Sequence, residues 1–539
     1  MWPLFRQVIS WASSWGRYCR ILIALFLFRG VVLLCVLPPF EGWDEYQHVA
    51  YAAYLVEEGH PPQLGEDSRI PPWMHAALVK YPHSHFGVEQ VGIIGGLTYE
   101  QYWTQASPPT VLVEESAIPL YQAQHPPLYY RLIAPIVRRM CPTSDLRSLI
   151  GVLRGLNLLL GAAAMALFLW AVGRLTTDGP HRYLIGLLAA VQPLFLMNCV
   201  RVANDALAVL LGSAAVVALL VCADPLAWKG RLVGGVALGA SILAKTVNLG
   251  LAPFACVAAI WPAPRGSRWA VRSLVALLVV LAPAVVLTYS YFSGNVSRYG
   301  MLTPMQEAVR NRSEGRTWRD AAAAARQINW PDELSRRFIR RSLWAGAWSF
   351  VNVPRWMHRG YEWMYLAAAA GYFWLMWHKR RVARPLFLTY RTIALLVVLN
   401  GSVAAGLMYH MLHSKMLCGT ITTNTWYAAV TFPWMLCLAC QGWACYPGSR
   451  LTAIFGGMLL SILITAEWYG VFLGMIPYYT QAGFFSLSIE RLASLHPVWL
   501  HPAVGGAAIL GGIATGVVAV GAWVRSMSAA PVSQFRSSE

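Results

Sequence analysis

The sequence predicts an all-α polytopic membrane protein, and three properties of the chain support this fold class. Of its 539 residues, 57% are hydrophobic and only 12% are charged, against roughly 25% charged in a soluble domain. Apolar runs of about 20 residues recur along nearly the whole length, and each is long enough to cross a hydrocarbon layer about 30 Å thick. The net charge of +18 indicates membrane topology rather than nucleic-acid binding, because Lys and Arg gather at the cytoplasmic ends of membrane helices.

We predict a bundle of about twelve transmembrane helices. The expected spans are residues 21–39, 150–173, 182–200, 203–222, 231–246, 248–262, 270–292, 361–378, 386–410, 425–445, 451–472 and 502–524. The first apolar run follows three arginines and lacks a small-residue cleavage site, so it reads as an uncleaved signal anchor. The short connections on one side are rich in Lys and Arg, which places both termini in the cytoplasm and the protein in the plasma (inner) membrane.

The spans and the segments between them divide the chain into six regions. These are the cytoplasmic N-terminus with the first helix (1–39), the first external loop (40–147), helices two to seven (148–292), the second external loop (293–360), helices eight to twelve (361–524) and a cytoplasmic tail (525–539). Both external loops are too long to be simple connections, so we expect them to be structured. The first holds twelve acids and six bases, and the second holds twelve arginines and five acids, so the two lobes can dock on each other.

Charged residues within or beside the spans are costly and usually functional. Nearly all of them, including Glu467, are predicted near the outer face of the membrane. Arg29 lies midway along the first span, where it snorkels or pairs inside the bundle. A ring of charges beneath two external lobes favours an active site at the outer membrane surface over a pathway through the membrane.

The first span is followed at once by a candidate base. Asp44, His48 and Tyr51 share one face of a predicted helix at the membrane exit. A carboxylate that is partly desolvated and has cationic neighbours suits general-base catalysis. Asp is also a common helix cap, and the spacing alone does not decide between these two roles.

The order of several motifs resembles the GT-C superfamily. Membrane glycosyltransferases of this superfamily take sugars from polyprenyl-phosphate or dolichyl-phosphate donors, and their nearest well-known types are the protein O-mannosyltransferases and the lipid A aminoarabinose transferases. The motif at 343–354 looks most like a bacterial branch of these proteins whose activities are largely unassigned. The motifs are the Asp44-Glu45 pair after the first helix, the His-Pro-Pro-Leu-Tyr-Tyr segment at 125–130, RVANDALAVL at 201–210, GVALGASILAKT at 235–246 and LWAGAWSFVNVP at 343–354.

The resemblance implies a GT-C-type bundle with specific site residues. It implies that Asp44 is the catalytic base with Glu45 as its neighbour, that Asp205 is a second acidic position, and that Lys245 contacts the donor phosphate. Further substrate-binding candidates are His48, His125, Tyr129, Arg131 and Arg201, of which the two arginines suit phosphate contacts. One departure concerns Trp426 and Tyr427, which stand where relatives carry an Arg-Tyr or similar pair, and this puts donor-sugar recognition in doubt.

Other residues have alternative interpretations. Six histidines in the first external loop make a zinc site conceivable, but their spacing fits no established ligand pattern. We expect hydrogen-bonding histidines, no metal site and no cofactor, with a divalent metal left undecided. The arginines at 310–341 either solvate a helix and hold lipid headgroups or bind an anionic acceptor. The sequence does not decide whether Cys141 and Cys418 pair.

The predicted function is inverting transfer of one sugar from a polyprenyl-phosphate donor to an external acceptor, in a glycan, lipid or protein of the cell envelope. The expected partners are that donor, membrane lipids and an acceptor that the sequence does not identify, without nucleic acid. The alternatives are a transporter or flippase of lipid-linked sugars, and a non-catalytic assembly protein on the same scaffold. A transporter would carry its charges near the bilayer midplane.

Overall fold

The computed structural model describes residues 13–65, 68–89, 93, 95–105, 116, 118–141, 145–177, 179–221, 228–261, 269–378, 386–447 and 449–528. The predicted cytoplasmic residues 1–12 and 529–539 lie outside this set, as do the connections at 222–227, 262–268 and 379–385. Within the described residues the all-α class is confirmed, since the only sheet there is a parallel pair of two-residue strands, β1 (Pro82–His83) and β2 (Leu97–Thr98).

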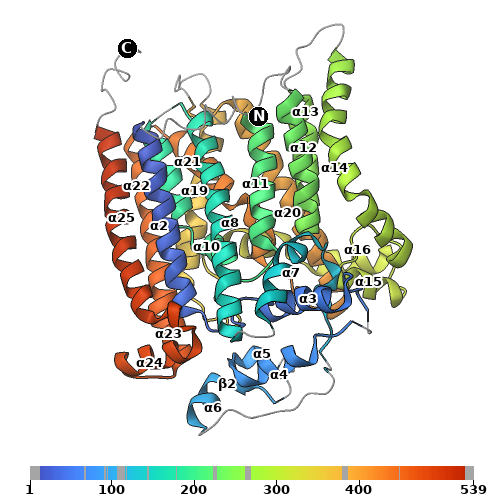
Figure 1. Ribbon diagram of the computed structural model, residues 1–539. Helices are drawn as coiled ribbons and strands as arrows, with labels where there is room; N and C mark the ends of the chain where they lie inside the picture. The colour runs from blue at the N-terminus through green and yellow to red at the C-terminus, as the bar shows by residue number, and fades with distance from the viewer. Residues whose placement is uncertain are drawn as a thin grey trace.

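The body of the protein is a bundle of long, roughly parallel helices (Figure 1). α2 begins and α25 ends at the same end of this bundle, and these two helices pack along each other. The bundle helices are α2 (Ser14–Val36), α8 (Leu146–Leu175), α9 (Gly179–Ala190), α10 (Pro193–Val200), α11 (Asp205–Val221), α12 (Trp228–Ala244), α13 (Ala252–Ile260), α14 (Trp269–Tyr299), α19 (Arg355–Trp377), α20 (Tyr390–Cys418), α21 (Phe432–Ala444), α22 (Ser449–Trp468) and α25 (Pro502–Ser528).

Each predicted span coincides with one of these helices or with a pair of them. Six helices in the described part of the chain are long and apolar enough to cross a membrane, and a bent pair, α9 with α10, makes a seventh if it is one span. Two further apolar helices, α11 and the 246–260 stretch, have fewer than 18 residues, and α19 is 23 residues long but is not among the six. The chain is therefore a membrane protein by its helices, and the count of twelve stays a prediction.

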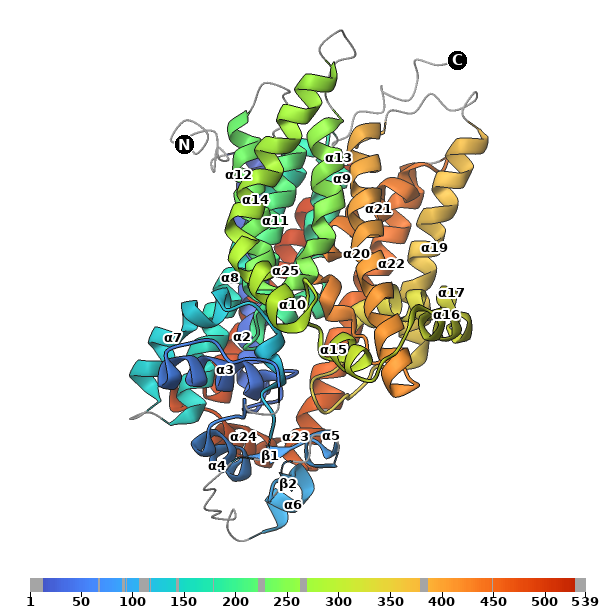
Figure 2. The ribbon, with the colours of Figure 1, turned by 90° about the vertical axis from the view of Figure 1, so that its right-hand side faces the viewer.

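The first external segment forms a lobe at the end of the bundle where α2 stops (Figures 1 and 2). Its elements are α3 (Glu45–Glu58), α4 (Pro72–Lys80), α5 (His85–Glu89), α6 (Tyr99–Thr104), the 3-10 helix η1 (Tyr121–Gln124) and α7 (Leu128–Met140). α3 packs against α7. The last elements before α25 lie at the same end: the π-helix η5 (Tyr469–Met475), α23 (Ile476–Thr480), α24 (Phe485–Leu495) and the 3-10 helix η6 (Val498–Leu500).

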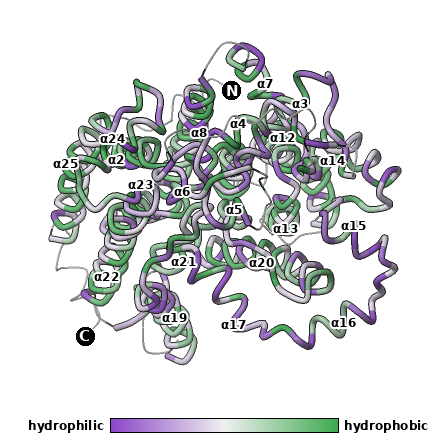
Figure 3. Tube along the Cα trace, turned by 90° about the horizontal axis from the view of Figure 1, so that it is seen from below, coloured by the Kyte–Doolittle hydropathy of each residue, from purple (hydrophilic) through white to green (hydrophobic). Residues whose placement is uncertain are grey.

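The second external segment lies beside α20 at this same end. It comprises α15 (Gln306–Ser313), α16 (Trp318–Gln327), α17 (Trp330–Leu334), the π-helix η3 (Ser335–Arg340) and α18 (Arg341–Leu343), and two further 3-10 helices, η2 (Thr246–Leu251) and η4 (Thr425–Thr431), complete the structure. Seen from the lobe end, α15 to α17 form a hydrophilic rim (Figure 3).

Among the described residues, the two external segments meet through hydrogen bonds and aromatic contacts, and docking through opposite charges stays a prediction. At one of these contacts the Glu41 carbonyl accepts from the Trp348 amide at 2.9 Å, and the Glu41 carboxylate accepts from the Ser349 amide at 3.1 Å. Burial raises the pKa of Glu41 to about 7. The arginines of the second segment pair instead with nearby acids, as Arg337 does with Glu333, because acids three or four residues away are the first partners that a helical arginine can reach.

The break between α9 and α10 bends the chain by 50°. Pro193 stands at the start of α10 and has no N–H for a carbonyl of the preceding turn. Arg29 of α2 donates to the freed carbonyls of Ala190 and Val191, the latter at 3.0 Å. Arg201 directly follows α10, the helix that begins after this bend.

Candidate functional site

Asp44 lies in a sharp turn between α2 and α3 rather than in the predicted helix. Its φ is 58°, a left-handed conformation, and α3 begins only at Glu45. The side chain makes no capping hydrogen bond, so Asp44 does not act as a side-chain cap. Gly42 lets this turn approach the bundle, because a Cβ at that position would lie 2.8 Å from the Cβ of Arg201.

The Asp44 carboxylate turns toward η1. Tyr121 donates its hydroxyl to Oδ1 at 2.6 Å, and the Gln122 amide donates to Oδ2 at 3.4 Å. Burial raises the pKa of Asp44, while the Tyr121 hydrogen bond and the charges of Arg201 and Lys245 oppose this shift. Asp44 and Tyr121 nevertheless keep partial exposure. An accessible carboxylate with a raised pKa is suited to accept a proton near neutral pH.

We expect Tyr121→Phe to move the acid limb of activity to higher pH. A base works when ionised, so activity falls as the pH drops through its pKa. Removing the hydroxyl that stabilises the carboxylate raises that pKa further, because a hydrogen bond to the charged form favours that form. The measurement is the pH profile of kcat/KM, with Tyr299→Phe as the control that leaves Asp44 untouched. An unmoved acid limb would show that Asp44 does not set it.

Behind Asp44 lies a buried charge cluster at the start of α11 and the end of α12. Asp205 accepts from Arg201 at 2.6 Å and from Lys245 at 2.7 Å, and at most 4% of each of these side chains is exposed. Two cations with one carboxylate leave one positive charge beside Asp44. Buried charges of this kind persist only when they are paired or serve a ligand.

Arg201 lies beside two indoles that stack on each other. The Trp43 and Trp426 rings stack with their centroids 4.5 Å apart, and the guanidinium lies 5.2 Å from the first and 5.4 Å from the second. It also donates to the Trp43 carbonyl at 2.7 Å. Lys245 lies 4.9 Å from the ring of Tyr427. The two aromatic residues that depart from the resemblance therefore contact the two cations directly.

Glu45 points away from Asp44 and joins the lobe to the bundle. Both of its oxygens accept from Arg154, at 2.8 and 2.6 Å, and Oε1 also accepts from the Val202 amide at 2.9 Å. Arg154 donates further to the carbonyls of Leu37 and Pro38 at 2.5 and 2.7 Å. This arrangement leaves Glu45 a positioning role: it holds the turn that carries Asp44.

The two predicted histidines lie side by side in the lobe. The rings of His48 and His125 stack at 6.4 Å, and His48 Nδ1 lies 2.9 Å from the Tyr130 hydroxyl. Burial lowers the pKa of His125 to about 3 and that of His48 well below its usual range. Both are therefore neutral at physiological pH, and His48 is hydrogen-bonded to Tyr130 while the buried Nδ1 of His125 has no partner. Among the described residues, no group of three or more His, Cys, Asp or Glu is placed to hold a metal ion.

Tyr129 and Arg131 lie further from Asp44. Tyr129 is buried and exchanges hydrogen bonds with Asn157, whose amide also donates to the Arg201 carbonyl at 2.5 Å. Arg131 is exposed on the outer side of α7. There it lines a separate cavity of about 640 Å³ with Arg138 and Arg139. Of the substrate-binding candidates, Arg131 is the one that the structure does not bring into the cluster.

The sequence analysis missed several site residues, among them Tyr121, Gln122, Asn157 and Trp43. Tyr121 and Gln122 lie in a four-residue 3-10 helix, which is too short for hydrophobic periodicity to detect. Their position just before His125 was the available signal. Asn157 lies inside an apolar span, where an amide is itself a sign of a buried polar contact.

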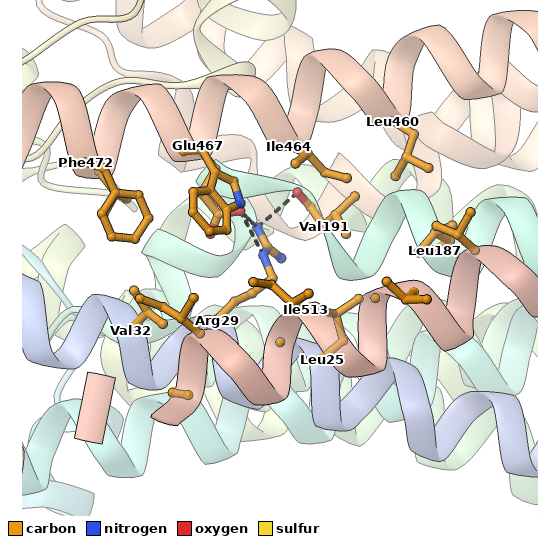
Figure 4. Close-up of a pocket in the computed structure, with 18 residues that line it drawn as sticks. Leu25, Arg29, Val32, Leu187, Val191, Leu460, Ile464, Glu467, Phe472 and Ile513 are labelled. Carbon is orange, nitrogen blue, oxygen red and sulfur yellow. Dashed lines mark hydrogen bonds and ion pairs between the residues drawn. The ribbon is translucent and has the colours of Figure 1, made fainter. Parts of the chain in front are cut away.

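A second ion pair lies deep in the bundle, away from this cluster (Figure 4). Arg29 pairs with Glu467 at 2.5 Å, beside a largely apolar cavity of about 490 Å³ between α2, α9, α22 and α25. The expected position of Glu467 near the outer end of its span was wrong, because the helix continues through the predicted end to Thr480. Arg29 and Glu467 neutralise each other, and Arg29 also donates to the carbonyls at the α9–α10 break, so we assign this pair a structural role. Cys141 and Cys418, whose pairing the sequence left undecided, are both free.

No protein-family model and no curated protein matches this chain. Among solved structures, the chain is similar to the crystal structure of the Archaeoglobus fulgidus oligosaccharyltransferase, determined in complex with Zn and sulfate. The two chains are 13% identical, with a TM-score of 0.34, and the similarity covers 87% of this chain and 53% of the other. This chain thus spans about half the length of that transferase.

Proposed function

We propose that this protein is a GT-C-type membrane glycosyltransferase that moves a sugar from a polyprenyl-phosphate donor to an acceptor outside the membrane. The observation that carries the proposal is the accessible Asp44 carboxylate beside the buried Arg201, Asp205 and Lys245 cluster, at the end of a membrane bundle. It combines a base for an incoming hydroxyl with a net positive charge for a leaving phosphate. A transporter is less favoured, because the described ion pair deep in the bundle is satisfied by its own partners.

The proposed reaction is a single displacement. Asp44 takes the proton of the acceptor hydroxyl as its oxygen bonds to the anomeric carbon, and the bond from that carbon to the phosphate oxygen breaks. The leaving polyprenyl phosphate keeps both electrons of that bond, and Lys245 and Arg201 offset its charge. One displacement inverts the anomeric centre. Glu45 and Asp205 act through their ion pairs, which hold Asp44 and Lys245 in place.

Lys245→Met tests the phosphate contact. We expect weaker binding of undecaprenyl phosphate and slower transfer, because the variant removes the ammonium group while retaining much of the side-chain length. Lys245→Arg should keep part of both, and Lys415→Met, at an exposed end of α20, is the matched control. Binding is measured with the purified chain in lipid nanodiscs. Unchanged affinity and turnover in Lys245→Met would make Lys245 an interface anchor and transfer the phosphate contact to Arg201 or the second external segment.

The proposal also places the site on the external or periplasmic side of the inner membrane. In a Cys418→Ser background, His85→Cys in the lobe should react with a membrane-impermeant maleimide in intact cells, after the outer membrane is permeabilised if there is one. The His85 side chain is 60% exposed. Ser528→Cys at the opposite end of α25 should react only after the inner membrane is lysed. The reverse pattern would invert the topology and remove the external acceptor from the proposal.

The acceptor and the transferred sugar can be found together from the products. Mass measurement of cell-envelope glycans with and without the gene should reveal a missing residue of fixed mass. Purified chain should then transfer that residue from its polyprenyl-phosphate form. Identical glycans in both strains, together with no binding of polyprenyl phosphate, would favour a non-catalytic role for the scaffold.

A further inference from the structure

A second carboxylate, Glu307, lies close to the Asp44 cluster but belongs to the other external segment. It is the second residue of α15, whose first amide, that of Gln306, donates to Gln124 of η1 at 3.0 Å. η1 also supplies Tyr121 to Asp44. The short helix η1 therefore contacts both Asp44 and the residue that precedes Glu307, so the two carboxylates lie in the same part of the molecule.

Glu307 faces an imidazole of α20 without a direct hydrogen bond to it. Its Oε1 lies 4.0 Å from His410 Nε2, and 20% and 16% of these side chains are exposed. A separation of 4.0 Å is too long for a direct hydrogen bond. His410 is held from behind, where its Nδ1 lies 2.7 Å from the Thr423 hydroxyl. The Thr422 hydroxyl also donates to Oε1 of Glu307, at 3.4 Å.

Tyr427 connects this pair to the proposed phosphate site. Its ring lies 5.1 Å from the His410 ring on one side and 4.9 Å from the Lys245 ammonium on the other. The Tyr427 hydroxyl is within electrostatic range of both Asp44 and Glu307. The order in space is therefore Lys245, the Tyr427 ring and then the Glu307–His410 pair, at short distances from one another. The parts of a sugar phosphate follow one another in the same order: the phosphate, the sugar ring and the hydroxyls on the far side of that ring.

We propose that Glu307 and His410 bind hydroxyl groups of the sugar that is transferred, with Tyr427 against the sugar ring, and that they select the donor sugar. This inference rests on the proposed glycosyltransferase function. A carboxylate and an imidazole offer acceptors and a donor to neighbouring hydroxyls, and a site built to hydrogen-bond a hydroxyl strongly rejects an analogue that lacks it. An acceptor bound at the same pair is the competing occupant, and the experiment distinguishes it.

The test compares bare undecaprenyl phosphate with a panel of undecaprenyl phosphates whose sugars differ at single hydroxyls. In nanodiscs, the full-length chain should prefer one sugar-linked form over the bare lipid. Glu307→Gln should weaken binding of that form about 10- to 100-fold, which corresponds to the loss of one hydrogen bond to a charged group. The variant should also show a smaller preference for one epimer of the sugar over another. Its affinity for the bare lipid should stay within about twofold, which also shows that the variant is folded. His410→Gln should behave alike, and Glu314→Gln, which alters an exposed carboxylate of the same segment, should bind as wild type.

Several outcomes would overturn the inference. Equal losses for the bare and sugar-linked lipids would make Glu307 a structural residue, and a change confined to the KM of the acceptor would assign the pair to the acceptor. An unchanged epimer preference would exclude selection by these groups. A wild-type chain that binds the bare lipid without preferring any sugar would refute this inference alone. A chain that binds no polyprenyl phosphate in any form would refute the proposed function and this inference with it.

Discussion

Asp44→Asn is expected to lower transfer about 10²- to 10⁴-fold while leaving the protein folded, because a positioned general base contributes a factor of this size. Asn keeps the size of the side chain and can still accept the Tyr121 hydrogen bond at its amide oxygen. It loses the ability to take a proton, together with the negative charge and the oxygen that accepts from the Gln122 amide. The measurement is turnover of the purified variant with saturating donor.

Donor binding separates this result from misfolding. The phosphate contact belongs to Lys245 and Arg201, so Asp44→Asn should bind undecaprenyl phosphate at least as tightly as wild type, since it also removes one negative charge beside the phosphate. Near wild-type turnover in this variant would remove Asp44 from the mechanism. Loss of both turnover and lipid binding would instead indicate that the turn after α2 had collapsed.

Arg154→Met is expected to cost about 3 to 5 kcal/mol of stability, because it leaves the Glu45 carboxylate buried without its partner. Glu45 is 0% exposed and Arg154 is 2% exposed, so solvent cannot replace the lost interaction. The measurement is unfolding of the purified chain in detergent. Arg147→Gln on the same helix is the matched control: its pair with Asp145 is about one-third exposed and should contribute less than about 1 kcal/mol.

Removing the orphaned charge should restore much of this stability. We expect the double variant Arg154→Met with Glu45→Gln to be clearly more stable than Arg154→Met alone, since a neutral amide costs less to bury than a carboxylate. Recovered transfer in the double variant would establish Glu45 as a positioning residue. A stable double variant without transfer would give the Glu45 charge a part in the reaction.

The sequence predicted the positions of the helices well, and for a physical reason. A segment that crosses a membrane must satisfy its backbone internally and be apolar along its length, so each span leaves a continuous signal such as that of 150–173. Where local and tertiary effects compete, the prediction was less accurate. The eleventh span was predicted to end at residue 472, but the helix continues through η5 and α23 to Thr480.

Of the candidate site, mainly the charged residues could be predicted from the sequence. Asp44, Asp205 and Lys245 stood out because charges beside apolar runs are rare, and the structure brings all three together. Their partners follow from folding: Tyr121 arrives from a short 3-10 helix, and Trp426 stacks on Trp43 across nearly 400 residues of chain. The left-handed backbone of Asp44 also depends on the turn around it. No local pattern encodes such contacts.

That left-handed turn limits which substitutions at position 44 can be interpreted. Residues with a Cβ pay for a positive φ, and Asp and Asn tolerate it best after glycine. An alanine or glutamate at this position would change the backbone and the chemistry at once, so its lost activity would not identify a base. The geometry thus narrows the amino acids acceptable at position 44 before catalysis selects among them. In a collection of related chains, an Asn at this position would mark members that kept the turn and gave up the reaction.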